Sequence, residues 1–117
     1  MHKVSDHNAQ LAVQHALLTI KHGALVVGFG QRLQKHDDQA ARQHGHRLEA
    51  CGHIIQQYAQ ESLFYAQSLT EGQNSTEVYS LAVEAHAEAA KVYIQAIQEC
   101  VSLAAEERIK RWRKNYL

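Results

Sequence analysis

The chain has 117 residues, of which 45% are hydrophobic and 21% charged, a composition typical of one folded domain and too apolar for intrinsic disorder. Twelve basic residues balance twelve acidic ones, so the overall charge gives no reason to expect nucleic acid or an anionic membrane as a partner. Proline is absent, which favours long helices, and Cys51 and Cys100 belong to no CxxC pair of the zinc-ribbon or thioredoxin type.

We therefore expect a single all-helical domain over residues 1–117. The N-terminal residues lack a basic segment followed by an apolar run, so no signal peptide is predicted. We expect a cytoplasmic protein with reduced thiols.

The first predicted helix covers about residues 5–35, beginning at Ser5 or Asp6, both good N-caps. Two rows of apolar residues run along nearly opposite sides of it. One row consists of Val13, Leu17, Ile20, Ala24 and Val27, and the other of Leu11, Leu18, Leu25 and Phe29. A helix with two apolar faces is covered from two directions, so we expect it to be central or to lie in an oligomer interface.

The stretch IKHGALVVGFG, residues 20–30, interrupts this helix with three glycines. A phosphate-binding loop is excluded because Phe29, and not Lys, follows Gly28, and a transmembrane helix because the run free of charge and histidine is too short. Close helix packing remains, through a strip of small residues that comprises Ala12, Ala16, Thr19, Gly23 and Gly30. The alternative is a kink near Gly28–Gly30 that would give a four-helix bundle.

The second predicted helix covers about residues 38–70 and carries a 3-4 alternation over four heptads, which is typical of coiled-coil packing. The row is Ala41, His44, Leu48, Cys51, Ile55, Tyr58, Ser62, Tyr65 and Leu69. Gly72 is suited to ending this helix, and Asn74 to Glu77 resembles a capping box that starts the next.

The third predicted helix covers about residues 75–113 and carries two parallel rows. The first is Tyr79, Ala82, His86, Ala89, Tyr93, Ala96, Cys100 and Leu103, and the second is Val83, Ala87, Ala90, Ile94, Ile97, Val101 and Ala104. We predict an antiparallel bundle of three long helices that associates into a larger bundle, most simply a six-helix dimer.

The chain contains nine histidines, and histidine is the commonest ligand of transition metals in proteins. We predict a protein without a cofactor, and a transition-metal site is the alternative. In an antiparallel bundle His15 lies level with Tyr58 and close to His86, so His15 and His86 with Glu61 or Glu88 could form a carboxylate-histidine site. The chain contains no ExxH motif, which argues against such a site.

The simpler interpretation places the histidines in a core or oligomer stripe, where they form hydrogen bonds. This stripe comprises His44, Cys51, Tyr58, His86, Tyr93 and Cys100. A histidine at an interface would make association sensitive to pH. Cys51 as a nucleophile would need an oxyanion hole that the sequence does not supply, so we predict a small buried side chain and no enzyme activity.

The C-terminal sequence RIKRWRKNYL is basic and aromatic, whereas residues 77–107 hold six glutamates and one lysine. We predict that this basic tip, defined as Arg108, Lys110, Arg111, Trp112, Arg113 and Lys114, binds a protein partner. Alternatives are contact with nucleic acid, pairing with an acidic stretch of another subunit, or compensation of the helix dipole with Trp112 covering the bundle end.

Residues 64–99, FYAQSLTEGQNSTEVYSLAVEAHAEAAKVYIQAIQE, resemble the helical hairpin of phasins, the amphipathic coat proteins of polyester storage granules. The similarity rests on Leu69, Glu77, Leu81, Tyr93 and Glu99. It implies an alternative function as a surface coat, although the histidine-rich first half, the cysteines and the basic tip depart from that family. From the residues themselves we predict a non-enzymatic adaptor or regulatory module that acts through self-association and a protein partner.

Overall fold

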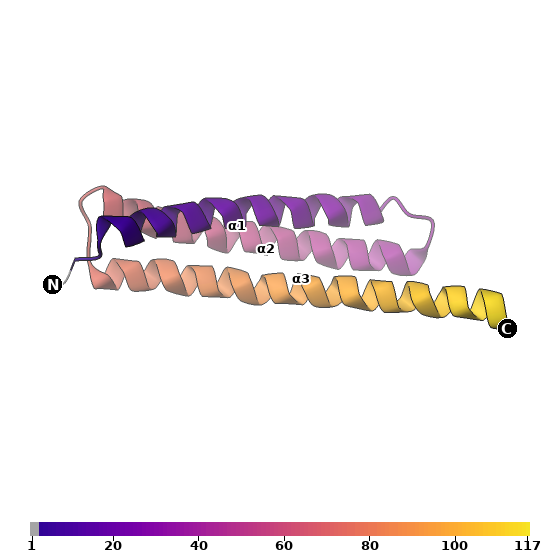
Figure 1. Ribbon diagram of the computed structural model, residues 1–117. Coiled ribbons are helices and arrows are strands. Elements are labelled where there is room, and N and C mark those ends of the chain that lie inside the picture. Colours follow the sequence, from indigo (N-terminus) through magenta and orange to yellow (C-terminus); the bar gives the residue numbers. More distant parts are fainter. Residues whose placement is uncertain (1–2) are drawn as a thin grey trace.

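The computed structural model describes residues 3–117 as three antiparallel helices, α1 (Asp6–Leu33), α2 (Gln39–Thr70) and α3 (Thr76–Tyr116), without strands in this part of the chain (Figure 1). They form a thin rod of 67 × 22 × 17 Å. The prediction of an antiparallel three-helix bundle is confirmed, and the predicted boundaries are close to those observed. The predicted domain begins at residue 1, and the prediction of no signal peptide also concerns the N-terminal residues. Residues 1–2 lie outside the described part of the chain.

Each helix begins at a side chain that accepts a hydrogen bond from the first turn. Ser5 Oγ accepts from Asn8 N at 3.1 Å, Asp38 Oδ1 from Ala40 N at 3.1 Å, and Ser75 Oγ from Val78 N at 3.3 Å. Such caps satisfy backbone N–H groups that have no partner within the helix. The helix starts are therefore fixed by short-range chemistry that the sequence displays.

The loop between α2 and α3 confirms one prediction and corrects another. Gly72 adopts φ of 104°, which ends α2, and the Gln73 N–H donates to the Ser68 carbonyl at 2.9 Å. Asn74 does not cap α3. It holds the N-terminal segment instead, because Oδ1 accepts from Val4 N at 2.7 Å and Nδ2 donates to Val4 O at 2.9 Å.

The glycine-rich stretch of α1 is continuous helix, so the kinked four-helix alternative is wrong. Small residues every seven positions form the side of α1 that is buried: Ala9, Ala16, Gly23 and Gly30. A matching series on α2 consists of Gly45, Gly52, Ala59 and Ala66. The predicted small-residue strip is thus confirmed for Ala16, Gly23 and Gly30, while Ala12 and Thr19 are half-buried beside it.

The two series bring the helix backbones of α1 and α2 together. A Cβ atom placed on Gly30 would lie 2.5 Å from Glu49 N and 2.6 Å from Gly45 O. A Cβ atom on Gly52 would lie 2.6 Å from Val27 N, and one on Gly23 would lie 3.0 Å from Gly52 O. No side chain fits at these contacts, so the cost of helical glycine is offset by a close crossing.

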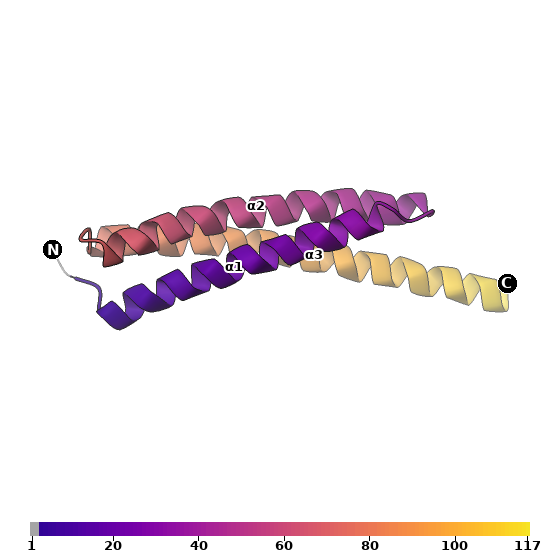
Figure 2. The ribbon, with the colours of Figure 1, turned by 90° about the horizontal axis from the view of Figure 1, so that it is seen from above.

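The central helix is α2, because α1 and α3 both pack along it and contact each other little (Figures 1 and 2). On α3 the buried residues are again small, namely Ala82, Ala85, Ala89 and Ala96. Ser62 Oγ donates to the Ala82 carbonyl at 2.9 Å, which shows how near the helices lie. Of the two predictions for the first helix, a central place in the bundle is wrong, and a place in an oligomer interface stays a prediction.

Length and composition alone would allow α1 to cross a membrane, since its 18-residue window reaches a mean hydropathy of 1.2 with 11% of that window buried. The prediction that α1 is too short to span a membrane rested only on the run free of charge and histidine, and the hydropathy of the longer window does not support it. In the bundle α1 lies along α2, with Gly23 and Gly30 against the α2 backbone.

Candidate functional site

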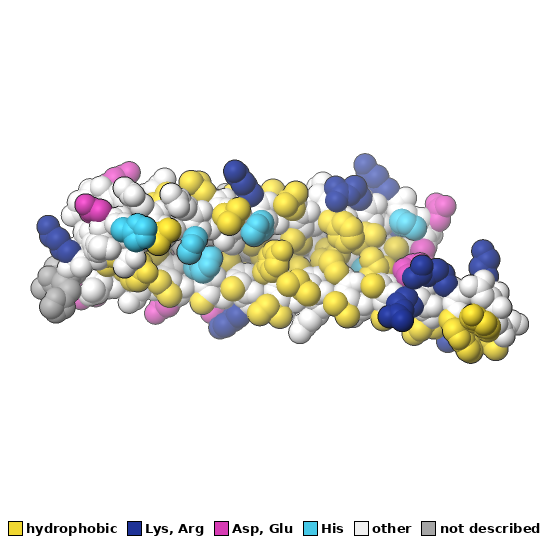
Figure 3. Space-filling model, viewed as in Figure 1, with side chains coloured by type: hydrophobic (Ala, Val, Ile, Leu, Met, Phe, Trp, Pro, Cys, Tyr) yellow, Lys and Arg dark blue, Asp and Glu magenta, His cyan; other side chains and the backbone are white. Residues whose placement is uncertain are grey.

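Large apolar side chains line an exposed surface between α1 and α3. We call this surface the open face, and it includes Leu25 and Phe29 of α1 and Ile94, Ile97 and Val101 of α3. The space-filling view shows hydrophobic side chains along the seam between the two helices (Figure 3). Its deepest part is a groove of about 440 Å³ lined by His22, Leu25, Val26, Phe29, Leu48, Tyr93, Ala96, Ile97, Cys100, Val101 and Ala104. Only Leu48 belongs to α2, so that helix supplies the floor.

The open face follows from the way the helices pack. Because α1 and α3 turn small residues toward α2, larger apolar residues such as Leu25 and Ile94 point away from it. Leu25 is 69% exposed, Ile94 55% and Val101 63%, values that are high for aliphatic side chains. The second apolar face predicted for the first helix is therefore present and uncovered in the single chain.

On α3 the exposed residues form a complete heptad row. Its members are Val83, Ala87, Ala90, Ile94, Ile97, Val101 and Ala104, all of which are exposed. Spacings that alternate between four and three residues are those with which helices pair in coiled coils. The row predicted as a widening of the α3 core stripe is therefore a separate surface that α2 does not cover.

Two aromatic pairs bridge α1 and α3 beside the groove. The rings of His15 and His86 stack with centroids 6.0 Å apart, and His22 lies 5.8 Å from the Tyr93 ring. The predicted proximity of His15 to His86 is thus confirmed. Within residues 3–117, however, no group of three or more potential metal donors forms.

The predicted carboxylate-histidine site is not assembled, because neither Glu61 nor Glu88 joins His15 and His86 in a group of potential metal donors. Glu88 Oε1 accepts a hydrogen bond from Lys91 on its own helix at 2.9 Å, and Glu61 is exposed. The predicted combination of His15 and His86 with Glu61 or Glu88 is therefore corrected to a pair of histidines.

The predicted core stripe is a mixture of buried and exposed positions. His44 is buried, Cys51, Tyr58 and His86 are half-buried, and Tyr93 and Cys100 are exposed at the groove. Burial, and secondarily the charge of Glu99, raises the pKa of both cysteine thiols. A raised pKa reduces the fraction of thiolate, which is the reverse of what nucleophilic catalysis needs.

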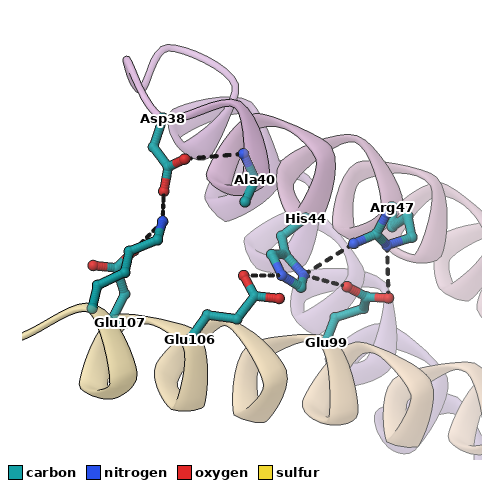
Figure 4. A network of polar contacts seen from close by, with 8 residues as sticks. Asp38, Ala40, His44, Arg47, Glu99, Glu106 and Glu107 are labelled. Carbon is teal, nitrogen blue, oxygen red and sulfur yellow. Dashed lines mark hydrogen bonds and ion pairs between the residues drawn. The ribbon is translucent and has the colours of Figure 1, made fainter. Parts of the chain in front are cut away.

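A polar network fixes the C-terminal half of α3 to α2 (Figure 4). His44 Nδ1 lies 2.6 Å from Glu99 Oε2, and His44 Nε2 lies 3.1 Å from Glu106 Oε2. Arg47 Nε donates to Glu99 Oε1 at 2.8 Å, and Arg47 Nη2 lies 3.2 Å from His44 Nδ1. Both ring nitrogens of His44 thus face carboxylates, an arrangement that suits the doubly protonated imidazolium.

The charges of this network follow from competing effects. Burial by itself would lower the pKa of His44, but the hydrogen bonds to Glu99 and Glu106 outweigh it and raise that pKa above 6.5. Burial would raise the pKa of Glu99, but His44 and Arg47 outweigh it and lower that pKa below 4.5. The prediction of His44 as a hydrogen-bonded core residue is confirmed, whereas its two carboxylate partners were not predicted.

The end of α3 extends past the loop between α1 and α2 (Figure 1). Lys110 forms an ion pair with Asp38, which is also the N-cap of α2. This ion pair lowers the pKa of Asp38 and raises that of Lys110. Trp112 is 54% exposed and its ring lies tilted against that of Tyr116, with 5.7 Å between the centroids, so it does not cover the end of the bundle.

The basic tip is consequently divided between two environments. All six residues of the tip are exposed, but Lys110 pairs with Asp38 and also lies 3.9 Å from Glu107, whereas Arg108, Arg111, Arg113 and Lys114 form no ion pair within residues 3–117.

Comparison with known proteins gives no match to this chain among protein-family models, curated proteins or solved structures.

Proposed function

We propose that this protein is a non-enzymatic association module whose open face pairs with a second copy of the chain. The observation that carries the proposal is the exposure of two long apolar rows, one on α1 and one on α3, on either side of one groove. Monomeric proteins rarely expose a continuous apolar surface of more than a few hundred Å².

The free energy available for association is large enough to support this proposal. Burying one Leu, Ile, Val or Phe side chain contributes about 1.5–3 kcal/mol. Leu25, Phe29, Ile94, Ile97 and Val101 are each more than a third exposed in the single chain. Their joint burial would offset the loss of translational and rotational freedom, which costs about 4–15 kcal/mol.

The exposed part of the basic tip supports a contact with a protein of opposite charge. It presents Trp112 and Tyr116 beside arginines, and Trp, Tyr and Arg are the residue types that contribute most to binding at interfaces. We propose that the tip provides this contact.

The test is to measure the molar mass of the wild type, Ile97→Glu and Gln95→Glu by light scattering. Ile97 lines the groove, whereas Gln95 is exposed on another side of α3, next to Arg47 and Glu99. We expect the wild type and Gln95→Glu to be dimers and Ile97→Glu a monomer, because a carboxylate in an apolar interface is costly. Equal masses for all three proteins would exclude this surface as the interface.

A coat function of the kind implied by the phasin resemblance gives a different result. The wild type would then remain a monomer and bind oil droplets, and Ile97→Glu would reduce that binding. Circular dichroism of each variant checks that a loss of association is not a loss of helical structure.

A further inference from the structure

We propose that the two copies pair antiparallel along α3, so that the basic end of each helix lies against the acidic beginning of the other. The inference rests on the proposed function and specifies its geometry. Three observations support it: the heptad row of α3, the distribution of charge along that helix, and the position of Leu25 beside the row.

The heptad row matches itself when one copy is reversed. If Ile94 of one copy packs on Ile97 of the second, the spacing of four and three residues continues in both directions. Val101 then packs on Ala90 of the second copy, and Ala104 on Ala87. Ile94, Ile97 and Val101 thus meet each other or alanine, whereas Val83, the remaining large member of the row, comes level with Arg108 of the second copy.

Charge distinguishes the antiparallel pairing from a parallel one. Residues 77–107 of α3 contain six glutamates and one lysine, whereas residues 108–114 contain five basic residues. In the antiparallel register Arg111 lies level with Ser80 of the second copy, and Glu77 and Glu84 lie about one turn to either side of Ser80. Lys114 comes level with Glu77. Parallel pairing would instead align the two basic ends side by side.

These acidic residues are available for such contacts. Glu77 and Glu84 are exposed, and neither forms an ion pair with any residue in the described part of the chain, 3–117. Arg111 and Lys114 are exposed as well, on the part of α3 that follows the ion pair of Lys110 with Asp38. The basic end of α3 can therefore pair with the acidic beginning of α3 in the second copy.

The first helix fits the same two-fold arrangement. His22 lies beside Tyr93, so Leu25 lies near the level of Ile94 to Ile97, where the two-fold axis passes. The groove side of α3 carries Tyr93 and Cys100 and faces α1. In an antiparallel pair, the two-fold axis places the groove sides of both α3 helices on the same side of the pair. Two α1 and two α3 helices then enclose a four-helix core, with each α2 outside.

The test measures distances between spin labels in the dimer, after Cys51 and Cys100 have been replaced by Ser. One label is attached at Gln95→Cys and, in a second protein, at Arg113→Cys, both of which are exposed. Antiparallel pairing predicts less than about 30 Å between the labels at position 95 and more than about 50 Å between those at position 113, from a rise of about 1.5 Å per residue.

The outcomes separate the geometry from the association itself. Short distances at both positions would show parallel pairing and overturn this inference while leaving the proposed function intact. An absence of coupling between labels at position 95, with wild-type helical content, would contradict association through this surface and thus both proposals. The unlabelled double-serine protein, sized by light scattering, serves as the control for the cysteine replacements.

Discussion

The backbone of Gly30 in α1 lies directly against that of Gly45 in α2, with 2.6 Å between the position of a Gly30 Cβ atom and the Gly45 carbonyl oxygen. Gly23 and Gly52 repeat the contact two turns further along the hairpin. Val27 and Leu33 flank these glycines and contact α2. Leu25 and Phe29 lie on another side of α1, where they form part of the open face.

Substitution of Gly30 by Ala tests this contact. We expect Gly30→Ala to lower the free energy of unfolding by about 1–3 kcal/mol, because the added methyl group meets backbone atoms that can move only if the helices separate. The loss occurs although alanine is favoured over glycine in a helix by about 1 kcal/mol. Urea denaturation followed by circular dichroism measures the difference.

Gly28→Ala is the matched control, in the same helix and with the same chemical change. A Cβ atom at Gly28 would meet only the flexible end of Arg32, at 3.6 Å. We expect Gly28→Ala to leave stability unchanged or to raise it by up to about 1 kcal/mol. Equal destabilisation by the two substitutions would show that the close crossing is not formed.

The network around His44 predicts a specific dependence of stability on pH. Since the folded pKa of His44 is raised, its contribution is fully present below the ordinary value of 6.5 and is lost as pH rises through the folded pKa. Since the folded pKa of Glu99 is lowered, its contribution is present above 4.5 and is lost as pH falls through the folded pKa. The network therefore stabilises most between these two ordinary values.

His44→Gln keeps a polar side chain but removes the titration. Glu99 and Glu106 face His44 from α3, and Arg47 faces it from α2, so the substitution leaves two carboxylates with one cation. We expect unfolding free energy to fall by about 1–3 kcal/mol in this window and by less at mildly alkaline pH. The comparison with wild type cancels the other histidines, and a constant difference at every pH would refute the charged role of His44.

Charge reversal at the end of α3 tests which parts of the two chains meet. Arg111→Glu should raise the dimer dissociation constant by about 2- to 10-fold, because it places a carboxylate beside Glu77 and Glu84 of the second copy. Adding Glu84→Arg should restore much of the affinity. Sedimentation equilibrium at low salt gives the constants.

Arg113→Glu makes the same change of charge on a side of α3 that points away from the proposed contact. It should weaken the dimer less than Arg111→Glu does, and Glu84→Arg should not compensate for it. If both reversals act equally, only the net charge of the tip matters and the specific pairing is refuted.

The sequence predicted the features that depend on neighbouring residues. Ser5 and Gly72 determine where a helix begins or ends through contacts within one turn, and these contacts are readable without the fold. The level of His15 with His86 followed from antiparallel helices joined by short loops. The same register puts His44 between the levels of Glu99 and Glu106, so a signal for that network was present.

The packing of α2 was harder to predict because two rows lie side by side on it. His44 and Cys51 belong to the apolar row toward α3, and Gly45 and Gly52, one position later, belong to the row against α1. The first row contains large apolar side chains and is recognised by its hydrophobicity. The second row consists of glycine and alanine, which hydrophobic spacing does not reveal. For the same reason, apolar spacing did not show that the second row of α3, with Ile94 and Ile97, stays exposed.

The mass of the wild-type chain in solution decides whether the open face pairs with a second copy. We predict that sedimentation equilibrium at tens of micromolar gives twice the mass of the chain, and that dilution yields the monomer. A single species with the mass of one chain across that concentration range would contradict the account.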